Sequence, residues 1–269
     1  ALPVASAQVK SAIILAALTA DGETEITEKG VSRNHTEIML KEFGGKISIS
    51  GRKIFVSPLD TAPKGRKIFV PNDFSSAAYF IAAALITKNS SILLKDTGIN
   101  ETRSYFLKKL SEAGAKVSTG NIRIKNGEKI ADVYAESSDL KGVSVSKEEV
   151  PLLIDELPLI AVLGAVSEGK TVIRGAKELR FKETDRIKAV CKNLKALGVP
   201  CGEFEDGLEV HGVGKIEGGS VDSFGDHRIA MSFSVLALSS KYGITVKGAE
   251  CVKISFPEFF DILKGVANG

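Results

Sequence analysis

The sequence predicts an α/β protein assembled from copies of one unit, and three observations lead to that prediction. A polar or small segment followed by an apolar helix recurs along the 269 residues, at Ser6, Ser75, Asp155 and Asp226, which are 69, 80 and 71 residues apart. A turn and a short strand follow each apolar helix. A second, amphipathic helix and further alternating strands come next, so the unit reads βαβαββ and four copies fill the chain.

The four apolar helices are expected at 12–18, 77–86, 159–166 and 229–238. Because their residues are apolar on nearly all sides, all four helices should be buried inside a domain. The short strands that follow them are expected at 22–26, 91–94, 169–173 and 243–246.

The amphipathic helices carry start and stop signals. They are expected at 35–43, 102–113, 184–197 and from Ser255 to residue 263. Thr184 and Ser255 are predicted to cap the last two, and Pro257 suits the first turn of the fourth. Glycines close the first three. Strands return at 46–50, 116–118 and 208–211.

A proline-rich segment separates the first copy from the second. The hexapeptide Gly-Arg-Lys-Ile-Phe-Val stands at 51–56 and again at 65–70, which predicts two short strands around a turn. A domain boundary is expected near Pro71, so residues 1–70 and 71–269 should belong to different domains.

Composition excludes several classes of protein. A net charge of +3 gives no case for a nucleic-acid surface. The apolar runs are shorter than the roughly 18–20 residues that span a bilayer, and no signal peptide is visible. The cysteines are odd in number and far apart, and like the histidines they lack metal-ligand spacing, so we expect a reducing compartment and no disulfide framework. These residues are Cys191, Cys201, Cys251, His35, His211 and His227.

The segment 179–186, Leu-Arg-Phe-Lys-Glu-Thr-Asp-Arg, is where we expect the chemistry. It holds three cations and two carboxylates at the start of a helix, an arrangement that suits a phosphate or carboxylate ligand. A solvated, salt-bridged helix start is the alternative. Charged residues also stand at the helix starts of the other copies, so several helix N-termini are expected to form a positive cleft for an anion.

Seven motifs in order resemble the 5-enolpyruvylshikimate-3-phosphate synthase family. They are Ser6-Ala7-Gln8, residues 32–37, 73–78 and 155–158, Lys182 to Arg186, Gly225 to Arg228, and Ser255-Phe256-Pro257. The resemblance implies the inside-out α/β barrel-like enolpyruvyl transferase fold, with two domains of three units each. With four units, the chain is similar to the C-terminal portion: residues 1–70 would be the last unit of an incomplete first domain, and 71–269 the second domain.

The resemblance also implies an activity. The family transfers the enolpyruvyl group of phosphoenolpyruvate to the 5-hydroxyl of shikimate 3-phosphate and releases phosphate, in aromatic amino acid biosynthesis. It implies a cytoplasmic enzyme, a glyphosate target, that is monomeric when complete and uses no cofactor, metal, nucleic acid or membrane. Because the family's N-terminal Lys-Ser, Arg and glycine loop have no counterpart here, we expect no measurable activity from this chain alone.

Site residues are carried over from the matching motifs. Asp155 and Glu183 would be the acid–base pair. Shikimate 3-phosphate would be held by Ser6, the backbone of Ala7, Gln8, Arg33 and Lys182. Phosphoenolpyruvate would be clamped by Arg186 and Arg228, with the bidentate geometry that lysine lacks.

Two further candidates and two alternatives stay open. His227 is either a structural donor or a site residue, and Lys253 is one position away from a lysine that the family often has, where Ile254 stands here. The sister enolpyruvyl transferase acting on UDP-N-acetylglucosamine is one alternative, although the Lys182 to Arg186 and Gly225 to Arg228 runs favour the shikimate enzyme. A non-catalytic fragment that serves as a scaffold is the other.

Overall fold

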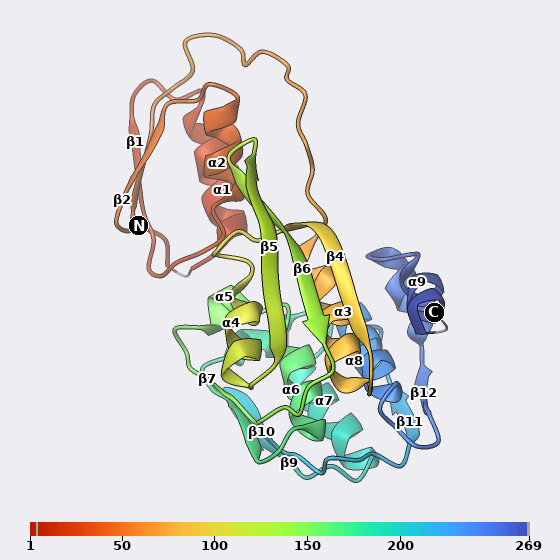
Figure 1. The fold of residues 1–269 in the computed structure, drawn as a ribbon. Coiled ribbons are helices and arrows are strands. Elements are labelled where there is room, and N and C mark those ends of the chain that lie inside the picture. Colours follow the sequence, from red (N-terminus) through yellow and green to blue (C-terminus); the bar gives the residue numbers. More distant parts are fainter. Residues whose placement is uncertain (4, 268–269) are drawn as a thin grey trace.

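The computed structural model describes residues 1–3 and 5–267, and four consecutive units fill this part of the chain (Figure 1). The first unit runs helix, strand, helix, strand, strand, and its antiparallel sheet has the order β1-β3-β2. Its elements are α1 (Ala7–Ala17), β1 (Thr24–Thr27), α2 (His35–Glu42), β2 (Ile47–Ser50) and β3 (Lys53–Val56).

The second unit repeats this element order with longer strands, in the sheet order β4-β6-β5. Its elements are α3 (Phe74–Ile86), β4 (Ser91–Gly98), α4 (Tyr105–Glu112), β5 (Lys116–Lys125) and β6 (Glu128–Glu136). The third unit has a four-stranded sheet with the order β7-β8-β10-β9. Its elements are β7 (Ser144–Val145), α5 (Val150–Leu153), α6 (Leu157–Val166), β8 (Lys170–Ile173), η1 (Lys177–Phe181), α7 (Arg186–Ala196), β9 (Cys201–Phe204) and β10 (Gly207–His211).

The fourth unit has one parallel strand pair, β11-β12. Its elements are β11 (Gly219–Asp222), α8 (His227–Ala237), β12 (Ile244–Lys247), η2 (Ala249–Ile254) and α9 (Phe259–Ala267). The α/β class and the repetition of one unit are therefore confirmed. None of the described helices is both long and apolar enough to cross a membrane.

The helices α3, α6 and α8 contact one another in the centre of the last three units, with the sheets around them. Eleven of the thirteen residues of α3 are buried, as are nine of the ten of α6 and seven of the eleven of α8. The predicted burial is confirmed for these helices and wrong for α1, of which Lys10, Ile14 and Ala17 alone are buried. Val9 and Leu15 of α1 are 44% and 58% exposed.

Two separate clusters of buried apolar side chains result. One is formed by residues between 2 and 56, and the other by residues between 74 and 263. They lie on either side of Pro71, and the division into domains 1–70 and 71–269 stays our proposal. The two parts touch where the β5–β6 hairpin reaches α2 (Figure 1). At the tip of this hairpin Gly127 has φ +75°, and a Cβ there would lie 2.7 Å from Ile38 Cγ2, so glycine permits the approach.

The structure corrects several predicted boundaries. The second hexapeptide, 65–70, forms no strand, and its Phe69 N–H donates to the side-chain oxygen of Asn126, in the turn between β5 and β6, at 2.8 Å. The helix α7 begins two residues after Thr184, since the carboxylate of Asp185 accepts from Lys188 N at 3.0 Å and caps it. Ser255 ends η2 and does not cap α9, which begins at Phe259.

Candidate active site

One side chain from each unit meets at the helix starts. Asp155, which precedes α6, is surrounded by the guanidinium groups of three arginines. Arg103 Nη1 lies 3.0 Å and Arg228 Nη2 3.4 Å from Asp155 Oδ2, and Arg33 Nη2 contacts the same oxygen. We call these four residues the Asp155 cluster. Arg103, Arg228 and Arg33 stand 52, 73 and 122 residues from Asp155 in the sequence. The cluster therefore forms only when the chain has folded.

The environment of Asp155 fixes its charge. Burial acts to raise its pKa, but the charges of Arg228, Arg33 and Arg103 outweigh burial and hold the pKa well below the usual range of a carboxyl. Asp155 is therefore a carboxylate at neutral pH. Anions that draw the arginines away from it would raise this pKa.

A second cluster forms around Arg186, the first residue of α7. Its side chain is 2% exposed, and Nε donates to Asp226 Oδ2 at 2.7 Å while Nη2 donates to Glu183 Oε2 at 2.7 Å. We call Arg186, Asp226 and Glu183 the Arg186 cluster. Asp226 is fully buried and also caps α8 by accepting from the backbone N–H of Arg228.

Arg186 Nη1 is buried and has no hydrogen-bond partner among the described residues. A buried donor without an acceptor is costly, and such groups are rare in folded proteins. A guanidinium edge left free in this way is a ready-made partner for one oxygen of a carboxylate or phosphate.

The remaining residues of the third unit's predicted site lie near the surface. Lys182 follows η1 and pairs with Glu178 Oε1 at 2.6 Å, with its side chain 27% exposed. The Glu183 side chain is 47% exposed and touches solvent as well as Arg186. Both side chains can reach a ligand only if it enters from solvent.

The predicted residues of the first unit lie at the start of α1. Ser6 caps the helix by accepting from Val9 N at 3.3 Å, with Ala7 and Gln8 in the first turn. No hydrogen bond or ion pair joins this turn to the Asp155 cluster in the described part of the chain. The buried Lys10 holds α1 against α2 and the loop before it, through Glu37 at 2.7 Å and Glu28 at 3.3 Å.

The two further candidates differ in their surroundings. Burial, together with the charge of Arg228, lowers the pKa of His227, so this half-buried ring is neutral at physiological pH. Lys253 is exposed in η2 next to Ile254, which is 85% exposed. The structure thus places His227 beside both clusters and leaves Lys253 at the surface.

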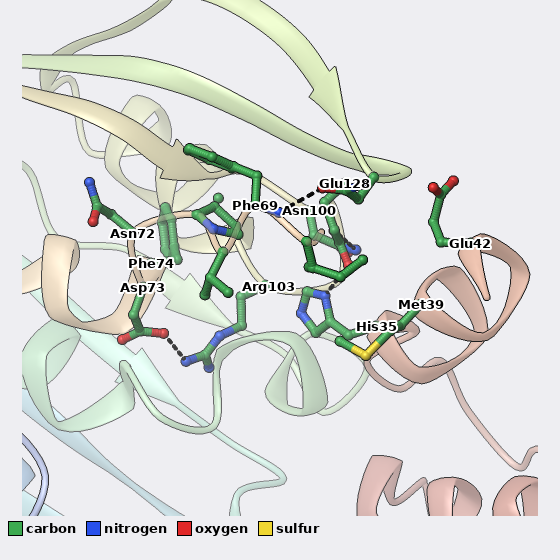
Figure 2. A pocket seen from close by; sticks show the side chains of 15 residues that line it. His35, Met39, Glu42, Phe69, Asn72, Asp73, Phe74, Asn100, Arg103 and Glu128 are labelled. Atoms are coloured by element: carbon green, nitrogen blue, oxygen red, sulfur yellow. Dashed lines mark hydrogen bonds and ion pairs between the residues drawn. The ribbon is translucent and has the colours of Figure 1, made fainter. Parts of the chain in front are cut away.

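Sequence reasoning missed Arg103, which bridges two carboxylates. Its Nη2 lies 3.1 Å from Asp73 Oδ1, the cap of α3 (Figure 2). Its Nη1 reaches Asp155. The repeat contained the signal, because Arg33 stands two residues before α2 and Arg103 two residues before α4. Equivalent positions in the two units therefore supply equivalent cations.

A second missed residue is Glu156, whose side chain is almost fully buried. It accepts from the hydroxyl of Ser75 and lies 4.0 Å from Arg228 Nη1, and burial raises its pKa. Its neighbour Asp155 is held ionised. Two adjacent carboxyl groups thus have pKa values shifted in opposite directions.

Contacts between the first and second units hold Arg33 near Asp155. His35 Nδ1 lies 2.6 Å from Glu128 Oε1, and Asn100 Nδ2 donates to Glu128 Oε2 at 3.0 Å (Figure 2). Asn100 Nδ2 also donates to Asn34 Oδ1 at 2.8 Å. A mainly apolar cavity of about 300 Å³ lies beside these contacts and reaches Arg103. No group of His, Cys, Asp or Glu in the described ranges is arranged to hold a metal ion.

Comparison with known proteins reveals a family. The sequence profile of EPSP synthase (3-phosphoshikimate 1-carboxyvinyltransferase) matches residues 1–263. The chain is 48% identical over 264 residues to the 3-phosphoshikimate 1-carboxyvinyltransferase of Thermodesulfovibrio yellowstonii, covering 98% of this chain and 61% of that protein. It is 50% identical over 267 residues to that of a Sulfurihydrogenibium species, covering 98% and 62%. The chain thus spans less than two thirds of these relatives.

Solved structures of related proteins have the same fold as this chain. The EPSP synthase of Acinetobacter baumannii superposes with a TM-score of 0.91 at 43% identity, over 98% of this chain and 61% of that one. The enolpyruvyl transferase NikO of Streptomyces tendae superposes with a TM-score of 0.75 at 19% identity, over 96% and 58%, which supports the fold alone. The predicted enolpyruvyl transferase fold is confirmed.

Proposed function

Because the chain belongs to the EPSP synthase (3-phosphoshikimate 1-carboxyvinyltransferase) family, we propose that it contributes an active site for enolpyruvyl transfer. The reaction moves the enolpyruvyl group of phosphoenolpyruvate to the 5-hydroxyl of shikimate 3-phosphate and releases phosphate. As part of this proposal we place the protein in the cytoplasm and take the complete protein to be a monomer.

The observation that carries the proposal is the charge balance of the Asp155 cluster. Three guanidinium groups face Asp155 there, and Arg103 also pairs with Asp73, so three cations meet two carboxylates. The surplus positive charge lies beside the unpartnered Nη1 of Arg186, in a site where helix N-termini meet. Two substrates that each carry a phosphate group would neutralise this surplus positive charge. A neutral substrate would not.

In the proposed binding mode, each substrate takes cations from the existing ion pairs. Shikimate 3-phosphate would draw Arg33 away from Asp155 and Lys182 away from Glu178, next to the first turn of α1 with Ser6, Ala7 and Gln8. Phosphoenolpyruvate would be clamped by Arg228 and by the free edge of Arg186. Binding therefore strips Asp155 of the cations that keep its pKa low.

This exchange supports a base role for Asp155. Once Arg33 and Arg228 hold substrate anions, the carboxylate can accept the proton of the attacking 5-hydroxyl as its oxygen bonds to C2 of phosphoenolpyruvate. Glu183 would deliver a proton to the methylene carbon C3 and later take one back. The tetrahedral intermediate then loses phosphate and C3 loses a proton, which restores the carbon–carbon double bond.

The test is phosphate release by this chain fused to the part of the Thermodesulfovibrio relative that it does not match, with the unfused chain as reference. Release is expected only with both substrates, and replacing shikimate 3-phosphate by UDP-N-acetylglucosamine should abolish it. Arg228→Gln should raise the KM for phosphoenolpyruvate, while the exposed control Arg52→Gln should not. A folded fusion that accepts the nucleotide sugar, or that is inactive with shikimate 3-phosphate, would overturn the proposal.

A further inference from the structure

Two cysteines that are ten positions apart come into direct contact in the third unit. Cys191 lies in the middle of α7, and Cys201 begins β9, the edge strand of its sheet. Their Sγ atoms are 2.7 Å apart, only about 0.7 Å longer than the roughly 2.05 Å of an S–S bond. The side chains are 2% and 8% exposed, and both thiols are free.

The backbone between the two cysteines holds them together. The connection from α7 to β9 is closed by hydrogen bonds from Leu197 N to Asn193 O at 3.1 Å and from Val199 N to Leu194 O at 2.9 Å. On the other side, Cys201 is in register with Val210 of β10. The turn and the sheet therefore bring the backbones of the two cysteines close together.

Two simpler accounts explain the contact less well. Metal binding needs further ligands, and the described residues contain no suitable group of three. Packing as two small apolar side chains explains the burial but not a sulfur–sulfur distance this short. Cys251, the third cysteine, lies in η2 and has no such thiol partner in the described chain.

We propose that Cys191 and Cys201 are a site of reversible oxidation, forming a disulfide with hydrogen peroxide as the two-electron oxidant. The Cys191 thiolate attacks one peroxide oxygen, which gives a sulfenic acid and, after protonation, water. Cys201 then loses its proton and attacks the Cys191 sulfur, so the S–S bond forms and the sulfenic oxygen leaves as a second water. Two thiols and one peroxide thus give one disulfide and two waters, and a small-molecule thiol reverses the change.

The order of attack follows from the surroundings of the two thiols. The hydrogen bond from the Cys201 thiol lowers the pKa of Cys191, and the same pairing together with burial raises the pKa of Cys201. Cys191 is accordingly the thiol that ionises more readily, and Cys201 is the resolving thiol. Because both are poorly exposed, an oxidant as small as peroxide suits the site.

The disulfide would join the middle of α7 to the edge of the sheet. It closes a short loop, which removes conformational freedom mainly from the unfolded chain. The melting temperature is expected to rise by on the order of 5–10 °C on oxidation, from the closure of a ten-residue loop in a chain of this size.

The test combines peptide mapping with thermal unfolding of the purified chain, before and after hydrogen peroxide. The count of free thiols in denaturant should fall from three to one. Tryptic peptides 189–192 and 196–215 should become linked, while 248–253 keeps its thiol, and dithiothreitol should reverse both the linkage and the rise in melting temperature. Cys251→Ser is the matched control and should form the same link, whereas Cys191→Ser and Cys201→Ser should each prevent it and abolish the rise.

The proposal is independent of the enolpyruvyl transfer activity. It fails if peroxide leaves three free thiols, if it converts Cys191 to a sulfinic acid with no linked peptide, or if the linked peptides include 248–253. If the Cys191→Ser protein does not fold, Cys201→Ser gives the same readout from the other side of the contact.

Discussion

The Asp155 cluster and the Arg186 cluster are opposites in charge. In the first, one carboxylate faces three guanidinium groups, and in the second, one guanidinium faces two carboxylates. The first takes one side chain from each unit, while the second takes all of its side chains from the third and fourth units. The comparison teaches that positive charge gathers where the units meet, whereas the buried Arg186 lies among an excess of carboxylates inside one of the two parts.

The largest effect is expected from Glu183, the exposed carboxylate of the Arg186 cluster. Glu183→Gln keeps the shape and removes the titration, so kcat of the fused enzyme should fall by about 10²–10⁴. The Kd of shikimate 3-phosphate should be unchanged or slightly lower, because a carboxylate beside two anions repels them. Steady-state kinetics and calorimetry measure the two quantities.

Two comparison variants sharpen this result. Glu205→Gln removes a carboxylate from a surface ion pair in the same unit and should leave kcat within about twofold. Lys182→Met should raise the KM for shikimate 3-phosphate instead of lowering kcat. If Glu183→Gln shows near-normal kcat with a raised KM, Glu183 is a structural charge and Asp155 is the principal proton carrier.

The second effect concerns the stability of the Arg186 cluster. Arg186→Met leaves the fully buried Asp226 without its cation, and the free energy of unfolding should fall by about 3–5 kcal/mol. Arg123→Met breaks a half-exposed pair with Asp96 and should cost about 1 kcal/mol or less. Urea unfolding of both variants measures the difference, and equal losses would contradict a special role for the buried ion pair.

The third effect is the pH dependence conferred by Asp155. Because its pKa is depressed in the folded chain, Asp155 contributes stability above the ordinary aspartate pKa of about 3.9, and that stability is lost as pH falls further. Asp155→Asn should therefore be less stable than the parent at pH 7. The gap between the two unfolding free energies should narrow steadily below about pH 4. A gap that stays constant through this range would show that the arginines do not stabilise the ionised form.

The smallest effect is expected from Arg103→Lys. Lysine keeps the charge but cannot bridge Asp73 and Asp155 at once, so the loss in unfolding free energy should be about 1 kcal/mol. Arg174→Lys, in an exposed pair with Asp206, should lose less than about 0.5 kcal/mol. If the two substitutions lower the free energy of unfolding equally, the bridge from Arg103 to Asp73 and Asp155 stabilises the protein no more than an exposed ion pair does.

The repeated unit could be predicted from the sequence because apolar helices followed by glycine turns are local signals. The sequence predicted α3, α6 and α8 as buried, yet it predicted the same for α1, whose pattern is similar. Periodicity shows that a helix face is apolar, and which element covers that face is a property of the whole assembly. The start of α7 was misplaced for a smaller reason, since Thr184 and Asp185 are both good caps and only the backbone shows which one is used.

The candidate site was predicted through its motifs, and its geometry was not. Arg103 stands outside the seven motifs, so the third cation on Asp155 could have come only from comparing equivalent positions in the first and second units. The unpartnered edge of Arg186 and the contact between Cys191 and Cys201 depend on distances that no spacing rule contains. Residue types and their order thus indicated the ligand class, and tertiary packing supplied the charge balance.

The assembly of the Asp155 cluster has a consequence for folding kinetics. Its contacts close loops of 52, 73 and 122 residues, while the strand pairs inside the units close shorter ones, such as the 45 residues from Ser91 to Glu136. Long loops cost more entropy to close, and non-local contacts form late. We expect the individual units to gain structure first, with Arg33 docking onto Asp155 among the last events. A refolding chain would therefore pass through a stage in which its sheets are formed and its anion-binding cluster is still open.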